Sequence, residues 1–140
     1  MNPDTTFPTL KVLVAEDDYL HASSLARSLE AAGAGVAGPV ATLAAALRML
    51  EREADIKAAV LDVELHGELV FPVAVLLRRK GIPFVFVSEQ PAVGVPFSFQ
   101  HVPWLPKPAP AVQLLRLLGQ DQVFEPLSVV GVSEKDLLAA

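Results

Sequence analysis

The chain has 140 residues, 52% of them hydrophobic and 19% charged, which fits one domain with its own core. No apolar run reaches the ~18 residues of a membrane span, and residues 1–10 resemble neither a secretory signal nor a transit peptide. We therefore expect a cytoplasmic protein with no membrane partner. The absence of cysteine excludes disulfides and thiol chemistry, and a net charge of -5 argues against nucleic acid as a partner.

Short apolar runs alternate with longer stretches of helical periodicity from residue 10 to about 119. The predicted strands, in chain order, are Lys11–Ala15, Gly35–Val40, Ala58–Leu61, Pro83–Val87 and Pro103–Leu105. Most of them are apolar on both faces, which is typical of a parallel sheet covered by helices. The stretches between them repeat apolar residues at helical spacing, starting at Ala22, Leu43, Val70 and Ala111. This alternation predicts an α/β fold, a doubly wound five-stranded parallel sheet.

Residue types at the ends of the helical stretches indicate where the helices stop and start. Gly33, Gly81 and Gly119 lie where helix C-caps favour glycine. Thr42 is suited to cap the N-terminus of the second helix. Pro72 fits the first turn of the third helix, where its missing N–H would have no helical partner.

Two parts of the chain depart from the alternating pattern. Residues 91–97 carry two prolines and a glycine, which predicts a loop or a single turn in place of a fourth helix. Residues 120–140 are too apolar for a solvated tail, so we expect them to pack on the domain or on a partner subunit. The predicted organisation is an N-terminal extension (1–9), a domain (10–119) and a C-terminal extension (120–140).

The charged and hydroxylic residues are concentrated just after the strands. Glu16 to Asp18 follow the first strand and Asp62 follows the third. Ser88 follows the fourth strand and Lys107 the fifth. In an open parallel sheet of order 2-1-3-4-5, ligands bind at the carboxyl ends of the strands, where strand order reverses between strands one and three. We expect Asp17 and Asp62 to flank that crevice.

Carboxylates that meet in such a crevice repel one another unless a cation compensates their charge. Oxygen ligands without a nearby His or Cys indicate a hard ion such as Mg²⁺. Asp62 can then attack phosphorus, with Lys107 as a fixed cation and Ser88 as a hydroxyl donor. A helix cap from Asp17 or Asp18 is compatible with this chemistry. The structural alternatives are a buried or capping carboxylate at Asp62 and a solvated charge at Lys107.

Three motifs carry a resemblance to a known family. Val12–Asp18, Val60–Asp62 and Leu105–Pro108 resemble, in order, the motifs of the response-regulator receiver family of two-component signalling, over roughly residues 10 to 119. The family has the flavodoxin-like (CheY-like) fold. The segment Gly81–Ser88 is similar to stand-alone receivers of alphaproteobacteria, whose fourth helix is often shortened or missing. The sequence departs from that subfamily at residues 89–91, where Glu89 replaces an expected threonine or small residue.

The resemblance implies a role for each residue of the acidic group. Asp17 would bind Mg²⁺ directly and Glu16 would bind it through water. Asp62 would be both a metal ligand and the phosphoacceptor, and Glu64 would contribute its backbone carbonyl.

The resemblance also implies roles on the last two strands. Ser88 stands in the place of the family's hydroxyl residue and Lys107 in that of its lysine, with a cis bond between Lys107 and Pro108. Trp104 falls at the position of the switch aromatic, although a lone tryptophan at the end of an edge strand is also typical of packing or an interface.

The resulting hypothesis is a phosphorelay protein rather than an enzyme, catalysing at most its own phosphorylation and dephosphorylation. It would accept a phosphoryl group from a histidine kinase or phosphotransfer protein and act on a downstream protein, and it would form a homodimer through the apolar tail or the Trp104 face. The alternative is a pseudo-receiver that binds proteins without phosphate, which Glu89 and the proline-rich interval favour. A phosphohydrolase would want a second aspartate where Glu64 stands, and an FMN site would want a phosphate loop in place of the acidic triplet.

Overall fold

The sheet of this protein has five parallel strands in the order β2-β1-β3-β6-β7. The structure is a computed structural model that describes residues 10–89 and 95–119. The strands are β1 (Lys11–Ala15), β2 (Gly35–Val40), β3 (Ala58–Asp62), β6 (Phe84–Ser88) and β7 (Trp104–Pro106). This is the predicted doubly wound order, and strand order reverses between β1 and β3 as expected.

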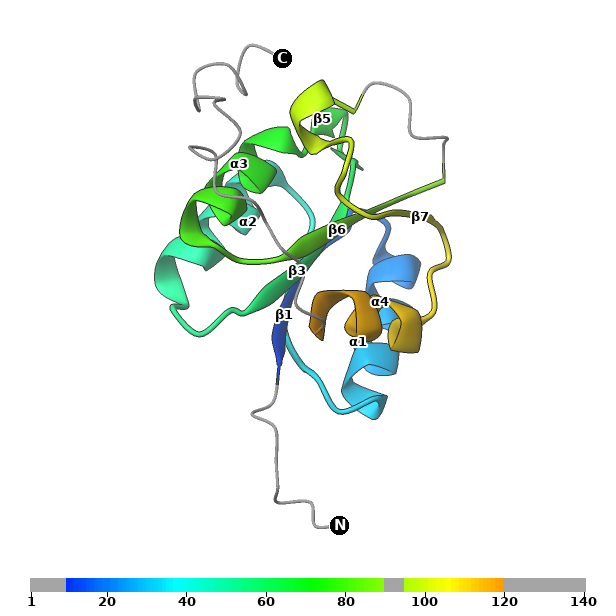
Figure 1. The fold of residues 1–140 in the computed structure, drawn as a ribbon. Helices are drawn as coiled ribbons and strands as arrows, with labels where there is room; N and C mark the ends of the chain where they lie inside the picture. The colour runs from blue at the N-terminus through cyan, green and yellow to red at the C-terminus, as the bar shows by residue number, and fades with distance from the viewer. Residues whose placement is uncertain (1–9, 90–94, 120–140) are drawn as a thin grey trace.

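Helices cover both faces of the sheet (Figure 1). One face carries α1 (Tyr19–Ala31) and α4 (Ala111–Gly119), and the other carries α2 (Leu43–Arg52) and α3 (Phe71–Lys80). Successive residues of a strand point to opposite faces, so each strand feeds both halves of the core. On β6, for example, Phe84 and Phe86 pack toward α2 and α3, while Val85 and Val87 pack toward α1 and α4.

The predicted helix signals at Thr42, Asp18 and Gly81 are confirmed, whereas Gly119 is the last residue of α4 itself. The Thr42 hydroxyl accepts a hydrogen bond from the Ala45 amide at 3.0 Å and caps α2. Asp18 caps α1 by accepting from the His21 amide. Gly81 ends α3 in the left-handed conformation, with φ 71.

The connection between β6 and β7 contains the 3₁₀ turn η1 (Phe97–Phe99) where a fourth helix would otherwise lie. The prediction of a loop or a single turn over residues 91–97 is therefore confirmed at residues 95–97, and the rest of it, over residues 91–94, lies outside the described residues. The predictions for the two extensions, 1–9 and 120–140, also lie outside them. No helix in the described ranges is both long enough and apolar enough to cross a bilayer.

One element was not predicted, a short antiparallel hairpin of β4 (Glu64–Leu65) and β5 (Glu68–Leu69) directly after β3. Its turn residues His66 and Gly67 both have positive φ, 49 and 81, as a tight two-residue hairpin turn requires. The His-Gly pair is the only sequence signal for it, because two-residue strands are too short to show alternation.

Two predicted strand starts are one residue early. Pro83 and Pro103 stand just before β6 and β7, since proline has no N–H to donate to the ladder. Their carbonyl groups still accept from Ala59 and Phe86 on the neighbouring strands.

Candidate functional site

The carboxyl ends of the central strands bring four predicted site residues to one edge of the sheet. Glu16 directly follows β1, Asp62 ends β3, Ser88 ends β6 and Lys107 directly follows β7. The first three are buried, with exposed fractions of 4%, 7% and 8%. Polar residues this deep need partners, because an unpaired buried charge is costly.

Lys107 supplies the charge partner for two of these residues. Its Nζ lies 2.7 Å from Oδ2 of Asp62 and 2.6 Å from Oε1 of Glu16. Burial lowers the pKa of Lys107, but the hydrogen bonds to Asp62 and Glu16 outweigh it, and the pKa lies above its ordinary value. Lys107 is therefore a fixed cation over the whole physiological pH range.

Backbone amides satisfy the other carboxylate oxygens. The Asp18 amide donates to Oε2 of Glu16 at 3.0 Å, and the Glu64 amide donates to Oδ1 of Asp62 at 3.2 Å. Burial raises the pKa of Glu16, while the hydrogen bonds from Lys107 and the Asp18 amide act in the opposite direction.

A hydrogen bond of Asp17 connects the edge of the sheet to the β4–β5 hairpin. Oδ2 of Asp17 accepts from the His66 amide at 2.7 Å, across the gap between the β1–α1 turn and the β4–β5 turn. This contact was not foreseen, because the hairpin that carries His66 was itself not predicted.

Glu16, Asp17 and Asp62 could together hold a metal ion. Each offers one carboxylate oxygen, and these oxygens all lie within 4.8 Å of one another. Three carboxylates against the single ammonium of Lys107 leave a formal excess of two negative charges, which a divalent cation would balance. The donors are all oxygen, so the set fits a hard divalent ion rather than a thiophilic one.

The remaining predicted residues lie around this cluster in different ways. Ser88 is aligned with Pro106 on β7, and its carbonyl accepts from the Lys107 amide at 3.0 Å. The Lys107–Pro108 bond is cis, as predicted. Glu89 is exposed.

The roles predicted for Trp104 and Glu64 are not tested by the positions of these two residues. Trp104 is aligned with Phe86 and packs against the core beneath α2 and α3, two positions along the sheet from Ser88. Its indole Nε1 is buried without a hydrogen-bond partner in the described part of the chain. Glu64 lies two residues beyond Asp62 in β4, and the structure gives its amide, but not its carbonyl, a contact with the cluster. The predicted switch role of Trp104 and the predicted carbonyl ligand at Glu64 stay predictions.

The fold and sequence are similar to those of several solved structures. The solution structure of SdrG from Sphingomonas melonis Fr1 is 34% identical, with a TM-score of 0.70, and the match covers 81% of this chain and 98% of that one. The BeF3-activated conformation of SdrG from Pseudomonas melonis Fr1 is 36% identical, with a TM-score of 0.67 and coverage of 80% and 98%. A response regulator receiver protein from Sinorhizobium medicae WSM419 is 26% identical, with a TM-score of 0.67 and coverage of 82% and 95%.

No family model and no curated protein matches the chain, so the solved structures alone carry the comparison. The matches cover nearly the whole length of these structures, 95% to 98% of each. The chain belongs to the response-regulator receiver family, the signalling modules of two-component systems.

Proposed function

We propose that this receiver accepts a phosphoryl group on Asp62, with Mg²⁺ bound by the neighbouring carboxylates, from a phosphohistidine of a kinase or phosphotransfer protein. The observation that carries the proposal is Lys107 Nζ, 2.7 Å from Asp62 and 2.6 Å from Glu16, beside a carboxylate set that a divalent cation would complete. The 36% identical structure described as a BeF3-activated conformation also supports it, since beryllofluoride imitates a phosphoryl group on a carboxylate.

In the proposed transfer, a carboxylate oxygen of Asp62 forms a bond to phosphorus. The bond from phosphorus to the donor's imidazole nitrogen breaks, and that nitrogen takes a proton. Lys107 neutralises charge on the transferred oxygens, and the Ser88 hydroxyl donates to one of them. When bound, Mg²⁺ would add positive charge on the same oxygens, and Asp17, Glu16 and Asp62 would hold it, with the Glu64 carbonyl as a further ligand.

We propose that the signal leaves through contact with another protein. The described residues form one receiver unit, which we take as residues 10–119, and the net charge of -5 of the whole chain does not favour nucleic acid. The pseudo-receiver alternative rests on the proline-rich interval and on repulsion from Glu89. Because Glu89 is exposed, that repulsion is limited to a few tenths to about 1 kcal/mol.

Binding of beryllofluoride tests the proposed site. Trp104 is the single tryptophan of the chain and pairs with Phe86 in the β6–β7 ladder, two positions before the Ser88–Pro106 pair, so its fluorescence can report on this edge. We expect a change on adding beryllofluoride with Mg²⁺, and none without Mg²⁺ or in Asp62→Asn. Nuclear magnetic resonance of the backbone amides provides a second readout. Binding that is unaffected by Asp62→Asn would contradict the proposal.

A further inference from the structure

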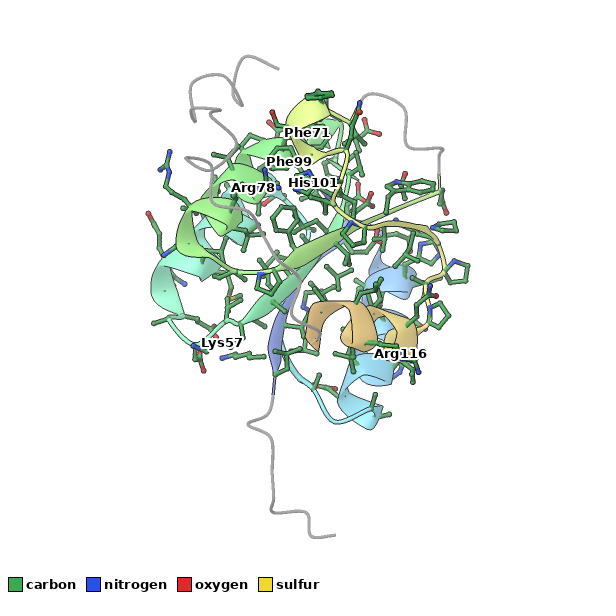
Figure 2. All side chains as sticks on the ribbon, in the orientation of Figure 1. Lys57, Phe71, Arg78, Phe99, His101 and Arg116 are labelled. Atoms are coloured by element: carbon green, nitrogen blue, oxygen red, sulfur yellow. The ribbon has the colours of Figure 1, made fainter. Side chains whose placement is uncertain are left out.

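Arg78 of α3 is a partly buried cation whose guanidinium contacts the β6–β7 connection at three residues. Its Nη1 donates to the Ser98 carbonyl at 3.1 Å, and its Nη2 lies 3.0 Å from Nε2 of His101. The guanidinium carbon lies 4.8 Å from the centroid of the Phe99 ring. Figure 2 shows Arg78, Phe99 and His101 grouped where α3 meets this connection.

The chemistry of these contacts defines the part that His101 plays in them. Arginine has only donors, so the Nη2–Nε2 contact is a hydrogen bond in the tautomer of His101 whose Nε2 accepts. The planar guanidinium thus makes two hydrogen bonds and a cation–π contact with one short segment, 98–101.

This cation has no carboxylate partner among residues 10–89 and 95–119. Within the same ranges its Nε is buried without a hydrogen bond, and burial lowers the pKa of the guanidinium, although arginine stays protonated at any physiological pH. Desolvation without a counter-charge offsets much of what the contacts contribute. The attachment is therefore specific in geometry but small in net free energy.

The segment that Arg78 holds is bounded by two residues of the candidate site. It follows Ser88 and leads through β7 to Lys107, whose amide donates to the Ser88 carbonyl. Its anchor is Phe99, which is 1% exposed and stacks on Phe71 with ring centroids 6.0 Å apart. Through this anchor, the turn that leads into β7, and from there to Lys107, is held against α3.

We propose that Arg78 is a positioning residue that latches residues 95–102 onto α3, and that this latch opposes engagement of a phosphoryl group by Ser88 and Lys107. The proposal rests on the proposed function of Asp62. The latched conformation is the one in which Lys107 lies on the Asp62 carboxylate. By linkage, an interaction made in that conformation alone weakens binding of any ligand that prefers the other one.

Arg78→Met tests the latch because methionine keeps an apolar chain over Phe99 but removes the charge and both hydrogen bonds. We expect beryllofluoride with Mg²⁺ to bind Arg78→Met about fivefold or more tightly than the wild type. Without beryllofluoride, amide hydrogen exchange over residues 95–102 should be faster in the variant. The matched control is Arg116→Met, which removes an exposed arginine from α4, on the other face of the sheet, and should change neither quantity (Figure 2).

A second pair of variants leaves α3 intact in case Arg78→Met does not fold. His101→Leu removes the acceptor and should tighten binding, whereas His101→Gln offers a carbonyl oxygen in its place and should restore wild-type affinity. Unchanged or weaker binding in both Arg78→Met and His101→Leu would overturn the latch, as would unchanged hydrogen exchange. If beryllofluoride fails to bind the wild type, the proposed function fails with it, which distinguishes that result from a failure of the latch alone.

Discussion

Lys107 is the residue on which the electrostatics of the acidic edge depend. Its side chain is 9% exposed and contacts Asp62 and Glu16, whose side chains are 9% and 3% exposed. With a raised pKa, its contribution to stability is fully present below the unfolded pKa near 10.4 and is lost only as pH rises through the folded value. Near neutral pH the contribution is complete.

Replacing Lys107 by methionine should therefore destabilise the fold by about 3 kcal/mol at pH 7, because two buried carboxylates lose their charge partner. Glu16 already has a raised pKa, which would rise further without Lys107. In the variant, folding would therefore be coupled to uptake of a proton by this carboxylate. The penalty should shrink as pH falls toward the ordinary carboxylate range near 4.

Urea unfolding at the two pH values measures this effect. The matched control is Lys57→Met, at an exposed lysine just before β3. Its free energy of unfolding should stay within ±0.5 kcal/mol of the wild type, roughly the range of surface substitutions. A Lys107→Met penalty that is small at pH 7, or that does not depend on pH, would mean that the carboxylates find other partners.

At the scale of elements, the ladder between β1 and β2 is irregular near its end, before the pair of Ala15 and Val40. The register of β2 with β1 shifts between Leu13 and Ala15, and Gly38 has φ +93 at that point. A Cβ at Gly38 would lie 2.8 Å from the Val40 amide nitrogen and 3.2 Å from the Val14 carbonyl oxygen, which are both backbone atoms. A side chain at Gly38 is therefore unfavourable for two reasons. Its Cβ would come too close to backbone atoms, and the backbone there has a left-handed conformation.

Gly38→Ala should lower the free energy of unfolding more than Gly33→Ala does. Gly33→Ala is the control, because there only the left-handed backbone conformation is unfavourable. Gly33 has φ +102 but nothing within 4 Å of its Cβ position, so alanine there should cost roughly 1–2 kcal/mol of left-handed strain. Gly38→Ala should exceed that by about 1 kcal/mol or more, as expected for overpacking. Thermal unfolding of the two variants measures both losses of stability. Equal losses would show that β2 shifts to make room for the Cβ at no cost in free energy.

How much of these elements could be predicted depends on how local their causes are. The strands follow from runs of apolar residues, and the caps at Thr42 and Asp18 follow from short-range hydrogen bonds. The gathering of Asp62 and Lys107 follows from where parallel strands end. The contacts of Arg78 could not be predicted, because they join residues 20 and 23 positions apart through a turn whose path the sequence does not define.

At the scale of the whole molecule, a bound divalent ion should stabilise the fold because it binds the folded carboxylate set and not the unfolded chain. At ten times its Kd, Mg²⁺ should add about 1.4 kcal/mol to the free energy of unfolding. Asp17→Asn should remove most of this gain, and Glu30→Gln, at an exposed carboxylate of α1, should leave it intact. Equal stabilisation of all three proteins by Mg²⁺ would place the ion elsewhere.

The homodimer remains a prediction, carried by the Trp104 face or by residues 120–140. Sedimentation velocity at high micromolar concentration, with and without beryllofluoride and Mg²⁺, measures it. We expect self-association, and a clean monomer in both conditions would contradict it.

Chemical phosphorylation tests the central claim most directly. Incubation with acetyl phosphate and Mg²⁺, followed by peptide mapping at low temperature, should place a phosphoryl group on Asp62 that hydroxylamine releases, as it does from acyl phosphates. Chelation of Mg²⁺ or Asp62→Asn should abolish the modification, while Asp55→Asn, at an exposed carboxylate near the other end of β3, should not. Failure to modify Asp62, or the same modification in Asp62→Asn, would contradict the assignment of Asp62 as the phosphoacceptor.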